Sequence, residues 1–359
     1  MKNLRPLFPD LDIAADVPAL VAGPCSAESR ELTLEAALSL AAGGVRIFRA
    51  GVWKPRTHPG GFEGVGEQAL PWLKEVQRTT GMKVVTEVAT PDHVRAVVRA
   101  GLDGIWIGAR TAANPFAVQE IADTLASLPQ TARDGLAVMV KNPVSPDLEL
   151  WIGALQRING AGIRRLGAIH RGFGYYNPGS GAPYRNAPYW AIPIELMRRF
   201  PELPVFFDPS HTGGRRDLVE PLSREALQMG FRGLIVEVHP EPDAALSDAA
   251  QQLTPEQFLH IAAPLRRGAD SPSEESLTLL REDIDLIDSE LLNLLKRRMD
   301  VSRRIGELKK RSGLSVVQPS RYARLIDDRT AAAASLGLSP EFIRKVFANI
   351  HEESVKTQL

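Results

Sequence analysis

The stretch PVFFDPSHTGGRRDLVEPLSREALQMGFRGLIVEV, residues 204–238, decides the fold. Its two ends, PVFFD (204–208) and GLIVEV (233–238), are short apolar runs rich in β-forming residues. Between them lies the amphipathic segment PLSREALQMG, which closes with a glycine as helices commonly do. A strand, a helix and a second strand in this order predict a parallel βαβ unit. Each strand carries an acidic residue at its carboxyl end, Asp208 in the first and Glu237 in the second.

The same alternation of apolar runs and amphipathic segments extends from about Pro18 to Leu265. It adds six expected strands: ALVAG (19–23), VRIFRA (45–50), KVVTEV (83–88), GIWIGA (104–109), LAVMVK (136–141) and RRLGAI (164–169). Eight strands alternating with helices over roughly 250 residues predict a TIM (β/α)8 barrel, and we assign residues 1–265 to this α/β domain. A doubly wound open sheet is the alternative, but no GxGxxG motif follows the first strand.

The pattern becomes purely helical after the barrel. We interpret the polar residues 266–275, which include Ser, Pro and Gly, as a linker to a second, smaller all-α domain over residues 276–359. Apolar side chains then follow three-four spacing through residues 276–311, which predicts one helix about 50 Å long. Because a small domain cannot cover so long a stripe, we expect a homodimer through the helical domain.

Two shorter helices are expected near residues 320–334 and 339–357. The second begins with SPEF, which places Ser339 as the N-cap and a proline in the first turn.

The composition excludes several classes of function. The 43 Lys and Arg residues balance the 43 Asp and Glu residues, so the net charge is zero and no basic stripe indicates a nucleic-acid partner. No segment has the length and hydropathy of a signal peptide or a membrane span, so we expect a cytoplasmic protein without membrane contact. The single cysteine, Cys25, excludes an intrachain disulfide and is typical of a reducing compartment.

Polar residues gather at the carboxyl ends of the expected strands, where TIM barrels carry their active sites. They are Cys25, Arg49, Lys54, Arg56, Glu87, Arg110, Lys141, His170, Arg171, Asp208, His211 and Glu237. A surface ion pair would explain any one of them, but all eight strand ends carry such a residue.

This set divides into two groups by chemistry. Cys25, His211, Glu237 and one residue of HPEPDAALSDAAQQ (239–252) offer a thiolate, an imidazole and two carboxylates, which suit a first-row divalent ion. Softness of the ligands alone does not choose among Mn²⁺, Fe²⁺, Co²⁺ and Zn²⁺. The remaining cations form a ring that suits one or two phosphorylated acids, because guanidinium groups bind phosphate and carboxylate bidentately.

Five motifs then resemble the compact, metal-dependent 3-deoxy-D-arabino-heptulosonate-7-phosphate (DAHP) synthases over residues 18–265. They are GPCSAES (23–29), FRAGVWKPRTHP (48–59), IGAR (107–110), FFDPSHTGGRRDLVEPLSREAL (206–227) and IVEVHPEPDAALSDAAQQLTPEQF (235–258). The resemblance implies condensation of phosphoenolpyruvate with erythrose-4-phosphate. It places one divalent metal ion, for which we expect Mn²⁺ first, on Cys25, His211, Glu237 and Asp248.

The resemblance also assigns the substrate contacts. It places phosphoenolpyruvate on Arg49, Lys54, Arg110, Lys141 and Arg171, and erythrose-4-phosphate on Arg56 and Thr57. We expect Glu87 and Asp208 to bind substrate as well, and Lys141 to act as a proton donor.

Two alternatives remain for the barrel. The first is 3-deoxy-D-manno-octulosonate-8-phosphate synthase, because IHRGFGYYN (169–177) resembles the sixth-strand motif of that family. The loop KPRT (54–57) instead favours the four-carbon aldose phosphate. The second is a sugar-phosphate sensor without catalysis, which would not need four metal ligands.

The helical domain resembles the all-helical chorismate mutases over about residues 276–358. The resemblance rests on LTLLREDIDLIDSELLNLLKRRMDVSRRIGELKK (277–310) and FIRKVFANIHEESVKTQ (342–358). It places the site, whose substrate would be chorismate, on Arg281, Arg298, Lys309, Arg321, Ser354 and Gln358. Two arginines would clamp carboxylates, Lys309 and Gln358 would contact the ether oxygen, and Arg281 would serve the partner's site.

One departure concerns VVQPSRY (316–322), which puts Gln318 and Tyr322 where many members carry acidic residues near the substrate hydroxyl. The alternative for this domain is therefore a non-catalytic regulatory dimerisation module. Because the barrel pattern begins near residue 1, we expect feedback control, by prephenate or chorismate, to act through the helical domain.

Overall fold

The computed structural model describes residues 1–11, 17–54, 60–175, 184–265 and 274–358. The chain divides into two units, Met1–Ala269 and Asp270–Leu359. The predicted linker falls mostly on residues 266–273, which lie outside the described residues, so its bounds stay a prediction.

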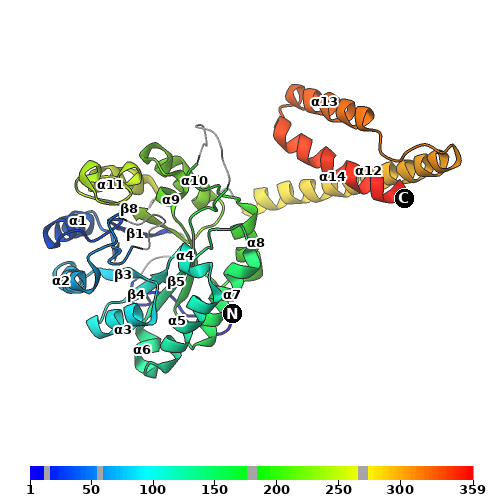
Figure 1. The fold of residues 1–359 in the computed structure, drawn as a ribbon. Helices are drawn as coiled ribbons and strands as arrows, with labels where there is room; N and C mark the ends of the chain where they lie inside the picture. Colours follow the sequence, from blue (N-terminus) through cyan, green and yellow to red (C-terminus); the bar gives the residue numbers. More distant parts are fainter. Residues whose placement is uncertain (12–16, 55–59, 176–183, 266–273, 359) are drawn as a thin grey trace. The chain divides into compact units, whose positions relative to one another are not determined.

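The first unit is a closed parallel barrel, as the sequence predicted (Figure 1). Each strand pairs with the next along the chain, and the first pairs with the last, so the sheet has no free edge. In the described part of the chain the strands are β1 Ala19–Gly23, β2 Ile47–Arg49, β3 Lys83–Val88, β4 Gly104–Ile107, β5 Ala137–Lys141, β6 Leu166–His170, β7 Val205–Phe207 and β8 Gly233–Glu237.

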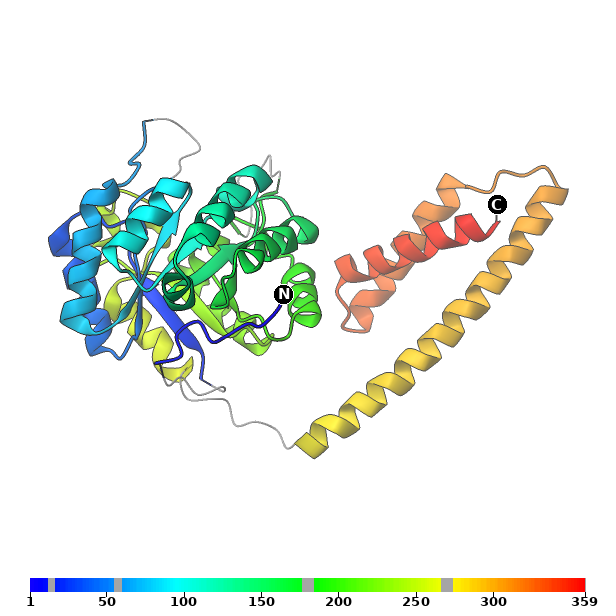
Figure 2. The same ribbon diagram turned by 90° about the horizontal axis from the view of Figure 1, so that it is seen from below.

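Helices surround this barrel between successive strands (Figures 1 and 2). Their starts follow from local chemistry: the Ser29 hydroxyl accepts from the backbone of Leu32 at the start of the first helix, and Thr90 accepts from His93 at the third. The described α-helices of this unit are α1 Arg30–Ala42, α2 Leu70–Thr80, α3 Pro91–Ala100, α4 Ala109–Ala112, α5 Pro115–Ser127, α6 Gln130–Gly135, α7 Leu148–Gly160, α8 Ala191–Arg199, α9 Pro209–Gly213, α10 Val219–Gln228 and α11 Pro255–Leu265.

The amino-terminal segment seals the end of the barrel at which the strands begin (Figure 2, dark blue). Its buried side chains Leu7, Phe8 and Leu11 belong to the same apolar cluster as Ile47 and Phe206 inside the barrel. Each such side chain contributes about 1.5–3 kcal/mol when it is withdrawn from water. The closed apolar end leaves the other end, where the strands finish, as the place for polar chemistry.

His170, at the end of β6, is buried in an aromatic cluster. Its ring lies 5.4–6.1 Å from the rings of five neighbours, Trp151, Phe173, Trp190, Phe207 and Phe231. Its Nε2 lies 2.7 Å from the Pro188 carbonyl oxygen and donates to it as the neutral ring. Burial lowers the pKa of His170 from its usual 6.5 to about 3.

This burial predicts a pH dependence of stability. Unfolded His170 takes up a proton below pH 6.5 and the folded residue does not, so its contribution is present above pH 6.5 and is lost as pH falls towards 3. Between pH 6 and pH 4, the unfolding free energy of the wild type should therefore fall about 1.4 kcal/mol per pH unit more steeply than that of His170→Asn. Urea unfolding followed by tryptophan fluorescence measures this for the barrel, since all five tryptophans lie before residue 191. If the unfolding free energies of the wild type and His170→Asn fell equally steeply with pH, a buried neutral His170 would be contradicted.

The described residues of the second unit form three helices: α12 Glu274–Arg311, α13 Pro319–Ser335 and α14 Pro340–Gln358. Helix α14 packs against both others, and the Ser339 hydroxyl accepts from the backbone of Phe342 at its start, 3.4 Å away. Figure 2 shows α12 continuing well past the two shorter helices. Its predicted apolar stripe is exposed in the single chain at Ile284, Ile287, Leu291, Leu294, Val301, Ile305 and Leu308.

Candidate active sites

A polar pocket forms at the carboxyl ends of the barrel strands. Its lining side chains come from strand ends and from the segments that follow them, which the closed barrel brings together: Lys54, Glu87, Ala109, Arg110, Lys141, Arg171, Arg185, His211 and Asp248. Seven of these were predicted from the sequence to belong to the site. Cationic groups outnumber the acidic ones, so the pocket favours anions.

Four potential metal ligands meet beside this pocket. Ligand atoms of Cys25, Glu237 and Asp248 all lie within 4.8 Å of one another, and the Cys25 Sγ is 3.4 Å from Asp248 Oδ2. His211 Nε2 is 3.6 Å from Glu237 Oε1 and 3.8 Å from Asp248 Oδ2. Pairing of β1 with β8 sets Gly23 opposite Glu237, which brings the thiol two residues later beside that carboxylate.

The charges of these groups suit a cation. Burial, and then Glu237, raise the pKa of the Cys25 thiol to about 12. Burial alone would raise the pKa of Glu237, but His211 and Arg49 outweigh it and lower that pKa. The site therefore holds an ionised carboxylate beside a protonated thiol, and a divalent ion binding there would displace the thiol proton.

Asp208 connects this cluster to Lys141. Its Oδ2 accepts from Lys141 Nζ at 2.9 Å and lies 2.8 Å from His211 Nδ1, while its Oδ1 accepts from the backbone of His211 at 3.0 Å. Burial opposes ionisation of Asp208, but His211 and Lys141 hold its pKa well below the usual range. The side chain is fully buried and orients His211 and Lys141 from beneath the pocket.

The predicted cations occupy two depths. Lys54 Nζ donates to the Cys25 carbonyl oxygen at 3.1 Å and also lines the pocket. Arg171 donates to Asn186 Oδ1 at 2.8 Å, and burial lowers the pKa of Arg171 to about 10, which leaves it charged at neutral pH. Arg49 lies deeper, fully buried, 3.2 Å from Glu237 Oε1 and 4.9 Å over the Trp106 ring.

Two predicted contacts cannot be placed. Arg56 and Thr57 lie outside the described residues.

Glu87 lines the pocket, and its Oε2 accepts from the Trp106 indole at 3.2 Å.

Sequence reasoning missed the side chains that fix the potential metal ligands. Arg185 donates to Asp248 Oδ1 at 3.0 Å and to Gln251 Oε1 at 2.6 Å, and Gln251 donates to Glu237 Oε2 at 2.7 Å. Gln252 Oε1 accepts from the backbone of Cys25 at 2.9 Å. The QQ pair three residues after Asp248 was a signal that could have identified the two glutamines.

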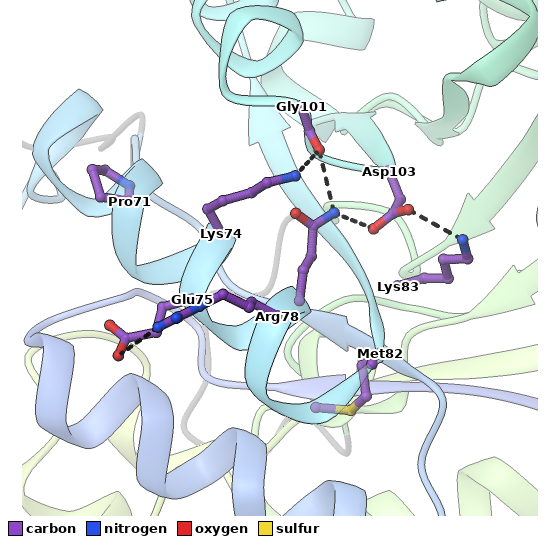
Figure 3. A pocket seen from close by; sticks show the side chains of 10 residues that line it. Pro71, Lys74, Glu75, Arg78, Met82, Lys83, Gly101 and Asp103 are labelled. Atoms are coloured by element: carbon purple, nitrogen blue, oxygen red, sulfur yellow. Dashed lines mark hydrogen bonds and ion pairs between the residues drawn. The ribbon is translucent and has the colours of Figure 1, made fainter.

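A larger groove of about 770 Å³ lies where β3 begins, at the opposite end of the strands (Figure 3). Its charged groups bind one another or the backbone: Lys74 Nζ donates to the Gly101 carbonyl oxygen at 2.9 Å, and Lys83 Nζ lies 3.3 Å from Asp103 Oδ1. These pairs leave no converging set of charges toward a ligand, so we assign the chemistry to the smaller pocket.

The helical unit has a second polar cluster between α12 and α14. Arg298 on α12 donates to the Ser354 hydroxyl and to the Ile350 carbonyl oxygen on α14. About one turn after Ser354 on α14, Gln358 Oε1 accepts from Nζ of Lys309 on α12 at 3.2 Å. The structure thus brings together four of the residues predicted for this site.

A glycine permits this close approach. A Cβ at Gly306 would lie 2.8 Å from both the Cα and the carbonyl oxygen of Gln358. Any side chain here would push the end of α14 away from α12 and separate Gln358 from Lys309.

Other predicted residues of the helical site lie outside the cluster. Arg281 precedes Arg298 by 17 residues on one continuous helix, which separates them by about 25 Å. Gln318 and Arg321 are exposed. The Tyr322 ring instead contacts the ring of His351, with centroids 4.3 Å apart.

Comparison with known proteins gives two matches along the chain. Residues 10–267 match the DAHP synthetase I family, and residues 280–359 match chorismate mutase type II. No helix in the described part of the chain is both long and apolar enough to cross a membrane.

Curated relatives and solved structures agree with the first match. A phospho-2-dehydro-3-deoxyheptonate aldolase of Thermotoga maritima is 37% identical over 262 residues, which cover 73% of each chain. Its crystal structure superposes with a TM-score of 0.63 and 35% identity, over 73% of this chain and 72% of that one. A 2-dehydro-3-deoxyphosphooctonate aldolase of Nitrobacter winogradskyi is 30% identical, covering 67% of this chain and 84% of its own length.

Proposed function

The chain belongs to the DAHP synthetase I family and also carries a type II chorismate mutase domain, and from this we propose how its residues perform the two reactions. The barrel condenses phosphoenolpyruvate with erythrose-4-phosphate and one water molecule to give DAHP and phosphate. The helical unit converts chorismate to prephenate. The observation that carries the first assignment is the cation-lined pocket directly beside four converging metal ligands.

Members of this family depend on a metal ion, and the donors found here fit one. A thiol, an imidazole and two carboxylates, each oriented by neighbours, make a mixed set that suits a first-row divalent ion, and we propose Mn²⁺ before Fe²⁺, Co²⁺ or Zn²⁺. When bound, the ion supplies Lewis acidity to an aldehyde oxygen.

The pocket side chains position phosphoenolpyruvate. Lys54, Arg110 and Arg171 follow three different strands, β2, β4 and β6, and face one small volume, so together they can bind a phosphate and a carboxylate on one molecule. Holding both anionic groups fixes the direction in which the nucleophilic carbon of phosphoenolpyruvate points and converts an encounter into a positioned reaction.

Lys141 is the proton donor in this proposal. Its ammonium group lines the pocket and is held by Asp208, 2.9 Å away. Replacing it in a Lys141→Met variant should lower kcat of the synthase at least about 100-fold, because methionine keeps the length of the side chain and removes its proton. Phosphoenolpyruvate consumption measures this. Lys74→Met, the same change in the groove at the other end of the strands, is the matched control, and a Lys141→Met enzyme that keeps most of kcat would disprove the role.

The mutase site binds chorismate and stabilises its transition state without forming a covalent bond to it. Arg298 clamps a substrate carboxylate, while Lys309 and Gln358 contact the ether oxygen as its bond breaks and charge develops there. Arg281 is too far from Arg298 to serve the same site, so we propose that it reaches the site of a second copy. The exposed apolar stripe of α12 would supply that dimer interface.

We also propose that the helical domain regulates the barrel. Prephenate or chorismate bound to the helical unit would lower synthase turnover. Unchanged turnover across the soluble range of prephenate would rule this out.

One experiment tests the barrel assignment. Phosphoenolpyruvate consumption is measured with erythrose-4-phosphate and with arabinose-5-phosphate, before and after a chelator, and again after adding Mn²⁺. Metal-dependent turnover with erythrose-4-phosphate is the expected result. Turnover with arabinose-5-phosphate alone would assign the barrel to the sister synthase, and no turnover with any metal would assign it to a sensor.

A further inference from the structure

We propose that His351, packed against Tyr322, is a further polar group that contacts the dianionic substrate of the helical unit, and that it takes up a proton when the dianion binds. This inference rests on the proposed mutase site. His351 is not among the residues that the sequence motifs assign to that site.

The position of His351 on α14 places it on the substrate side. His351, Ser354 and Gln358 are separated by three and four residues, so their side chains share one face of the helix. Ser354 and Gln358 on this face bind Arg298 and Lys309 of α12. The imidazole therefore belongs to the same row as the two residues that carry the predicted site.

Tyr322 on α13 holds the imidazole ring of His351 in place. Its ring centroid lies 4.3 Å from that of His351, at an interplanar angle of 30°. Tyr322 occupies a position for which the family resemblance predicts an acidic residue that contacts the substrate hydroxyl. An aromatic ring there cannot supply the carboxylate, but it holds an imidazole that can donate and accept hydrogen bonds in its place.

The charged groups around His351 are cations. Arg298 and Lys309 face it from α12 and, after burial, are the causes that lower the pKa of His351 below its usual 6.5. On α13, Tyr322 contacts the His351 ring directly. Arg329, also on α13, lies 5.9 Å from the ring of Phe347, which is one turn before His351 on α14. The free site therefore holds His351 neutral at pH 7.

A bound dianion reverses this balance. Two carboxylates placed among Arg298, Lys309 and His351 favour the protonated imidazole. The complex then binds more protons than the free protein, so affinity for the dianion rises as pH falls. Protonation adds an electrostatic contact to a carboxylate that is present in substrate and product alike, so the effect belongs to KM and leaves kcat nearly unchanged.

The test compares wild type with His351→Asn, which keeps a hydrogen-bonding side chain and does not titrate. Chorismate turnover is measured from pH 6 to pH 8, and the wild-type KM should be about threefold lower at pH 6. In His351→Asn, KM should be higher and independent of pH. Calorimetry with prephenate, in two buffers of different ionisation enthalpy, should show proton uptake by the wild type and none by the variant.

Controls separate this role from a structural one. His260→Asn changes an exposed histidine of the barrel unit and should keep the wild-type profile, and Tyr322→Phe should keep the pH dependence because it keeps the ring contact. A wild-type KM that does not change with pH, or a His351→Asn variant that follows the wild-type profile and proton uptake, would overturn the inference while turnover itself upholds the mutase. Absence of turnover in the wild type would overturn both.

Discussion

A Cys25→Ala variant is expected to lose synthase turnover by at least about 1,000-fold, because Lewis-acid stabilisation of this kind is worth several kcal/mol. In the proposed site Cys25 would supply the soft ligand, and because it is the single cysteine of the chain no other thiol can replace it. Phosphoenolpyruvate consumption at saturating Mn²⁺ is the measurement. Chorismate turnover by the same preparation is the internal control, and it should be unchanged.

A second readout does not depend on turnover. Loading the wild type with Co²⁺ should produce a thiolate-to-cobalt charge-transfer absorption, because Cys25 is the single cysteine of the chain. This band should be absent in Cys25→Ala. If the variant kept a tenth or more of the wild-type synthase activity, the metal site would have to be assigned elsewhere.

An Arg298→Ala variant should lose mutase turnover by about 1,000-fold. Arg298 is the cation that the α12–α14 cluster holds in place through Ser354 and the Ile350 carbonyl oxygen. Removing it takes away a charge-assisted contact to a substrate carboxylate and leaves the Ser354 hydroxyl without this donor. Chorismate disappearance measures the loss, while phosphoenolpyruvate consumption should not change.

The matched control for Arg298→Ala lies five residues further on the same helix. Arg303 is exposed and pairs with Asp300 at 3.1 Å, so Arg303→Ala makes the same substitution away from the cluster. It should keep nearly full mutase activity. Equal losses in the two variants would show that the effect comes from the helix and not from the site.

The order of strands and helices was predictable from the sequence, because buried strands are short apolar runs and the helices between them are amphipathic segments. The runs ALVAG and KVVTEV coincide with β1 and β3 residue for residue. ALVAG lies between two prolines, Pro18 and Pro24, and four of the six residues of KVVTEV are β-branched. VRIFRA was predicted over 45–50, but the strand covers only Ile47–Arg49. Strand ends depend on the hydrogen bonds of the neighbouring strands, which no local pattern contains.

Site residues were predictable from the sequence only where their position relative to a strand determines at which end of the barrel they lie. Lys141 is the last residue of β5 and His211 follows the end of β7 by four residues, so both had to lie at the carboxyl end of the barrel. The partners that orient them were not predictable, because Arg185 reaches Asp248 across 63 residues through a loop without periodic pattern. Asp208 was expected to bind substrate, and only the three-dimensional structure shows the contacts that bury it beneath Lys141 and His211.

The separation of Arg281 and Arg298 by 17 positions on one unbroken helix has a genetic consequence. In the proposed dimer, each mutase site takes one arginine from each chain. An allele that damages Arg281 and an allele that damages Arg298 can therefore complement each other, because a mixed dimer of the two products contains one site in which both arginines are intact. Two copies of the same damaged allele contain none.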